Sequence, residues 1–165
     1  MTEKMRIIEG LWFAVPLRDS GYAIGVISRV SPGRGVKTGF GYFFGQRYKD
    51  VPSLSDIKGI TPQDSIAMKM FSGLGFKNGT WLIIGVDDMW VRENWPMPAF
   101  ARQDAVSGAF QKIRYDDHDP RKTLYESPCS RDEALKLPRD GLSGYGAVEL
   151  VLTALINGEP VYGHS

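Results

Sequence analysis

The first half of the chain alternates short apolar runs with glycine- and proline-containing turns, a pattern typical of β-strands. Apolar runs over 11–17 and 22–27 flank turn residues at 18–21 and predict a hairpin. Gly25, in the middle of the second run, indicates a bulge or the close approach of a bulky neighbour. A third run over 39–45 predicts another strand.

A different period follows and predicts a helix near 62–72. Thr61 suits an N-cap, and Pro62 suits the first helical position, where its missing N–H costs nothing. The following apolar residues recur at spacings of three and four, which places them on one helical face. These residues are Ile66, Ala67, Met70 and Phe71.

The second half predicts shorter strands and a well-marked final helix. Strands are expected over 81–85, which we interpret as buried on both faces, and over 109–115 and 123–126. Helices are expected over 131–137 and over 145–156, the latter capped by Ser143. The pattern predicts an α+β fold in a single domain over 1–165. The predicted fold is a β-rich curved antiparallel sheet or partial barrel, with helices near 62–72 and 145–156.

Composition narrows the class of protein. The length of 165 residues suits one domain, with 42% hydrophobic and 24% charged residues. The net charge of +1 argues against a general nucleic-acid binder. No apolar stretch approaches the roughly 20 residues of a membrane helix, so we expect a cytoplasmic protein that does not contact membranes. One cysteine, Cys129, and two histidines exclude a disulfide framework and a histidine-rich metal cluster.

One polar cluster combines carboxylates with an imidazole, the groups that bind divalent metals. It consists of Asp116, Asp117, His118 and Asp119, and folding could bring Asp87 or Asp88 near it. The favoured interpretation is an aspartate-rich turn ahead of Pro120, because Asp side chains stabilise turns. A metal site is the alternative.

The aromatic residues also allow two interpretations. Tyr42, Phe43 and Phe44 are adjacent, so a strand must direct them to both faces of its sheet. Burial is favoured for at least part of this run. The alternative is that one face combines with Trp90 and Trp95 as an exposed aromatic patch that anchors a partner.

Several of these segments, in this order, resemble the immunity protein 26 family. The similar segments are 10–17, 21–26, 41–45, 81–85, Trp90 and 95–100, and the resemblance extends over about residues 8–155. It implies a small cytoplasmic protein that protects bacteria from a polymorphic toxin by binding it. The same broad family is also named for a small phosphotriesterase that hydrolyses organophosphates.

The leading hypothesis is therefore a binding protein without a cofactor, whose partner is a cognate toxin. Its candidate binding surface consists of Tyr42, Phe44, Arg47, Trp90, Arg92 and Trp95. The alternative is a metal-assisted phosphotriesterase, which needs an activated water. Its candidate catalytic residues are Asp117 and His118, and its candidate ligands for a divalent metal are Asp116, His118 and Asp119.

Overall fold

The computed structural model describes residues 7–161 and contains two β-sheets. The larger sheet has the strand order β5-β1-β2-β3-β4-β9, in which only the β4–β9 pair is parallel. Its strands are β1 (Leu11–Pro16), β2 (Tyr22–Val30), β3 (Thr38–Phe44), β4 (Ser65–Ser72), β5 (Leu82–Val86) and β9 (Leu142–Ser143). The smaller, antiparallel sheet contains β6 (Phe100–Gln103), β7 (Phe110–Asp116) and β8 (Asp119–Cys129).

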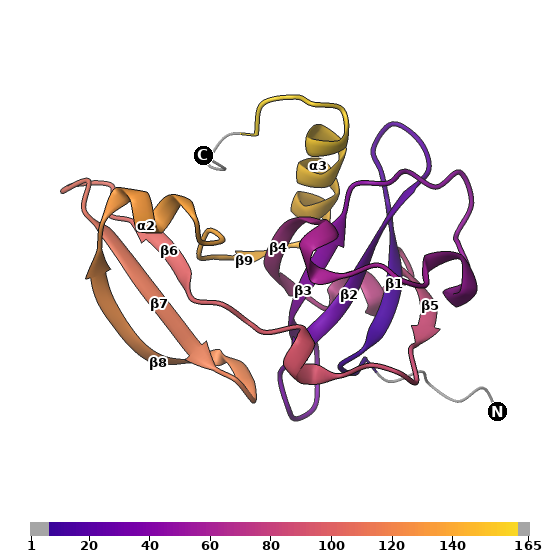
Figure 1. Cartoon of the computed structure of the whole chain (residues 1–165), viewed down its shortest axis with the longest axis horizontal. Coiled ribbons are helices and arrows are strands. Elements are labelled where there is room, and N and C mark those ends of the chain that lie inside the picture. The colour runs from indigo at the N-terminus through magenta and orange to yellow at the C-terminus, as the bar shows by residue number, and fades with distance from the viewer. Residues whose placement is uncertain (1–6, 162–165) are drawn as a thin grey trace.

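The helices are α1 (Leu74–Lys77), α2 (Arg131–Leu135) and α3 (Tyr145–Ile156). Short 3-10 helices occupy Leu54–Ile57, Pro62–Asp64 and Arg92–Asn94. Figure 1 shows the smaller sheet and α2 to one side of the larger sheet, while α3 lies against the larger sheet. The α+β class with an open, curved sheet is therefore confirmed. Among residues 7–161, every helix is too short or too polar to cross a bilayer.

Both faces of the larger sheet are apolar. Successive side chains of a strand point to opposite faces, and apolar residues occupy both sets of positions. On one face, Phe43 belongs to a buried cluster that includes Trp81 and Leu152 of α3. On the other face, Tyr42 and Phe44 belong to a second cluster, which includes residues of the segment after β5. The prediction that the 42–44 run faces both sides of its sheet is confirmed.

The predicted hairpin is also present, with β1 and β2 on either side of the 18–21 turn. A Cβ at Gly25 would lie only 2.7 Å from Cζ of Phe13 and 2.9 Å from Cδ1 of Phe43. The close approach of bulky neighbours, predicted from the sequence, is therefore the reason that this position holds glycine.

The predicted helix near 62–72 is wrong. Only Pro62–Asp64 turns, as a 3-10 helix, and the rest of the segment is strand β4. A spacing of four is an even number, so it fits one face of a strand as well as one face of a helix. Ala67 and Phe71 accordingly pack on one face of the sheet, and Met70 packs on the other.

Two smaller expectations also fail. Strand β5 is not buried on both faces, because it lies at the edge of the sheet and leaves Leu82 39% and Val86 37% exposed. Helix α3 is not capped by Ser143: its N-cap is Gly144, and no side chain caps it.

Candidate functional site

A loop over residues 87–94, here called the 87–94 loop, follows the edge strand β5. It begins with a tight turn in which the Trp90 N–H donates to the Asp87 carbonyl over 3.1 Å. The Asp87 carboxylate accepts the Met89 N–H over 2.9 Å, the bond of an Asx turn. The first turn of this loop is thus set by its own first residue.

The side chain of Trp90 anchors the loop to the body of the protein. Its ring stacks on Trp95 with centroids 5.1 Å apart and an interplanar angle of 18°. Gly10 also packs closely against Trp90: a Cβ at position 10 would lie 2.8 Å from Cγ of Trp90, and φ of Gly10 is +86°. Any larger residue at position 10 would therefore meet both a clash and backbone strain. Trp95 itself is held edge-on between Trp12 and Tyr42.

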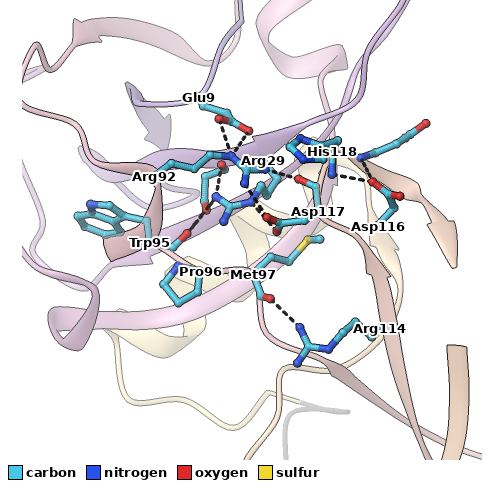
Figure 2. A network of polar contacts seen from close by, with 12 residues as sticks. Glu9, Arg29, Arg92, Trp95, Pro96, Met97, Arg114, Asp116, Asp117 and His118 are labelled. Atoms are coloured by element: carbon cyan, nitrogen blue, oxygen red, sulfur yellow. Dashed lines mark hydrogen bonds and ion pairs between the residues drawn. The ribbon is translucent and has the colours of Figure 1, made fainter. Parts of the chain in front are cut away.

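Arg92 ties the loop to two other parts of the chain (Figure 2). Its Nε donates to both carboxylate oxygens of Glu9 at 3.0 and 3.1 Å. Its Nη1 donates to Oδ2 of Asp117 over 2.6 Å, and its Nη2 donates to the Asp117 carbonyl. The contact with Asp117 is bidentate, with two N–H donors, and it restricts the guanidinium more than a single bond would.

The second partner of Asp117 is Arg29, whose Nε lies 2.8 Å from Oδ1. Arg29 is only 3% exposed, and its Nη1 donates to the Ser28 carbonyl over 2.7 Å and to the Trp95 carbonyl over 3.2 Å. A buried charge is tolerated when its hydrogen bonds are satisfied. Arg29 therefore joins β2, the segment after the loop, and the turn between β7 and β8.

The protonation of Asp117 reflects these contacts. Partial burial works to raise its pKa, but hydrogen bonds and charges from Arg29 and Arg92 outweigh burial and lower the pKa below its ordinary value. The carboxylate is therefore ionised at neutral pH, and it bridges two arginines.

The anchored loop directs other residues outward. Met89 is 82% exposed and Val91 is 46% exposed. Asp88 and Glu93 are exposed beside them, and within residues 7–161 neither forms an ion pair. Sequence reasoning missed these residues, although an Asp two positions before Met89 was a signal for an Asx turn.

The residues predicted as a binding surface do not form a common surface. Tyr42, Phe44 and Trp95 are 4%, 3% and 7% exposed, so the expectation that they form a surface patch is wrong. Burial of these large rings in the second cluster is the physical reason. Trp90 is half-buried and anchors the loop. Arg47 lies apart from it, bound to Asp19 and Asn157 near the end of α3.

The 116–119 cluster is the predicted turn. The Asp116 carboxylate accepts the N–H groups of His118 at 2.7 Å and Asp119 at 3.1 Å. Asp119 pairs with Arg121, whose Nε lies 2.9 Å from its Oδ1. Among the residues that the structure describes, no three His, Cys, Asp or Glu side chains are grouped so that they could hold a metal ion. The ligands and catalytic residues of the phosphotriesterase alternative are thus engaged in turn and ion-pair contacts or, like His118, exposed.

The comparison with known families bears on this site. The model of the immunity protein 26 family matches residues 8–112. The chain belongs to the immunity protein 26 family. The matched part of this immunity protein 26 domain includes the 87–94 loop and its anchors Gly10 and Trp95, whereas β8, α2 and α3 lie beyond it. No curated protein and no solved structure shows a significant match to the chain.

Proposed function

We propose that this protein neutralises a cognate bacterial polymorphic toxin by direct protein–protein binding in the cytoplasm. The observation that carries the proposal is the match to the immunity protein 26 family over residues 8–112. A stoichiometric inhibitor needs a surface complementary to its target and no reacting groups. The outward-facing apolar side chains Met89 and Val91 of the 87–94 loop support a role in binding.

The rigidity of the loop favours binding. The free energy of binding becomes less favourable whenever side chains and loops must be ordered at the interface. Here the Asx turn, the Trp90–Trp95 stack and the bifurcated Arg92–Glu9 hydrogen bond already order the backbone that presents Met89. Little further ordering is needed when a partner binds.

The test uses a candidate toxin, chosen from the products of the genes that neighbour this one. The two proteins are co-expressed, and bacterial growth and co-purification of the toxin are measured. We expect the wild-type protein to restore growth and to co-purify with the toxin in a fixed ratio. Phe13→Asp, which places a charge in the fully buried core, serves as an unfolded control.

Folded wild-type protein that neither retains the toxin nor restores growth would contradict the proposal. Protection without complex formation would also contradict it, because binding would then not be the mechanism. Circular dichroism on the purified protein establishes that it is folded in each case.

A further inference from the structure

The surface around the 87–94 loop has an apolar centre. The apolar side chains exposed there are Ile8 (41%), Val86 (37%), Met89 (82%) and Val91 (46%). They belong to one region because the Asp87 N–H donates to the Gly10 carbonyl over 3.4 Å and Arg92 binds Glu9. Met89 is well suited to a contact surface, since its unbranched thioether adapts to the shape of a partner.

The rim of this surface is acidic, although the chain as a whole carries +1. Asp87, Asp88 and Glu93 are exposed on the loop and form no ion pair in the described residues. Arg92, on the same loop, is already paired with Glu9 and Asp117. The three exposed carboxylates of the loop therefore have no ion-pair partner among the described residues, and they give the rim its negative charge.

We propose that this acid-rimmed patch is the surface that binds the toxin, and that it fits a face of the toxin carrying Lys and Arg around an apolar contact. The inference rests on the proposed function and adds the location and the chemistry of the interface. The apolar centre contributes affinity through burial, and the carboxylates contribute specificity and rate of association.

The charge pattern selects this partner over others. Two copies of the chain placed patch to patch would oppose carboxylate to carboxylate, which costs free energy when the charges lose their water. A nucleic-acid backbone or an anionic membrane is repelled by the same rim. A basic protein face is the occupant whose charge complements Asp88 and Glu93.

The test compares two double variants of equal charge change. Asp88→Lys/Glu93→Lys reverses the rim and leaves the Asx turn of Asp87 intact. The control, Asp132→Lys/Glu159→Lys, changes exposed residues of α2 and of the segment after α3. Affinity for the same candidate toxin is measured by calorimetry, together with the association rate at rising NaCl concentration.

We expect the rim variant to bind about tenfold or more weakly and to lose most of the salt dependence of association, while the control binds like wild type. Met89→Ala should weaken binding about fivefold without altering the salt dependence. Thermal unfolding of each variant near the wild-type temperature establishes that the fold is intact.

Three outcomes overturn the inference. If wild type and the rim variant bind the toxin equally, the interface lies elsewhere, and the proposed function stands without it. If wild-type protein forms a dimer that the rim variant dissociates, the patch joins two copies of the chain. If wild type binds no toxin, both the inference and the proposed function fail.

Discussion

Arg29 and Asp117 lie 88 positions apart in the sequence, yet the Nε of one and the Oδ1 of the other are 2.8 Å apart. Arg29 is on β2 of the larger sheet, and Asp117 is in the turn between β7 and β8 of the smaller sheet. The guanidinium is almost fully buried, whereas the side chain of Asp117 is 50% exposed. The ion pair between Arg29 and Asp117 thus joins the two sheets. Arg92 of the 87–94 loop binds the same carboxylate, which places the loop beside this junction.

Removal of this carboxylate should destabilise the protein. Asp117→Ala leaves the buried Nε of Arg29 without its partner, and we expect the free energy of unfolding to fall by about 2 kcal/mol. Urea denaturation followed by tryptophan fluorescence measures the change. Asp50→Ala, an exposed position, is the matched control and should unfold like wild type. Equal stability of Asp117→Ala and wild type would show that the ion pair contributes nothing.

The same contact should respond to acid. Because the pKa of Asp117 is lower in the folded protein, its stabilisation is complete above the ordinary aspartate pKa of about 3.9. That stabilisation disappears as the pH falls through the lower, folded-state pKa. The stability difference between wild type and Asp117→Asn should therefore shrink below about pH 4. Urea unfolding from pH 7 to pH 2.5 tests this, and a difference independent of pH would refute it.

The close packing at Gly25 should make even one methyl group costly. Gly25→Ala places a Cβ against the fully buried rings of Phe13 and Phe43, so we expect a loss of about 1–3 kcal/mol. Gly144→Ala is the control, since its φ is −68° and no atom lies within 4 Å of the added Cβ. The unfolding temperature is measured for both variants, and an equal decrease in the two would disprove the packing argument.

Burial of the aromatic residues also has a measurable consequence. Phe44 is 3% exposed and stacks on Trp12 with centroids 5.5 Å apart. Phe44→Ala should therefore cost about 3–5 kcal/mol of stability through the cavity it leaves. Denaturant titration gives the value directly. If the variant folds with wild-type stability but binds the toxin more weakly, Phe44 belongs to the binding surface and not to the core.

The local patterns of the sequence predicted much of the fold. The β1–β2 hairpin, β3, α2 and α3 follow from residue preferences and turn chemistry within about ten neighbouring positions. The turn at 116–119 is equally local, because Asp116 accepts N–H groups two and three residues ahead of it. Strand β4 was not predicted, because its apolar residues at a spacing of four fit a helix as well as a strand, and only its pairing with β3 and packing on both faces decide between them.

The candidate site shows the same division. The sequence alone established the α+β class and the resemblance to a family, and it indicated the importance of the segment around Trp90 and Trp95. Only tertiary structure decided that Trp95 is buried, that Arg92 binds both Glu9 and Asp117, and that Met89 faces solvent. The physical reason is that turns depend on neighbouring residues, whereas exposure and ion pairing depend on which distant elements pack together.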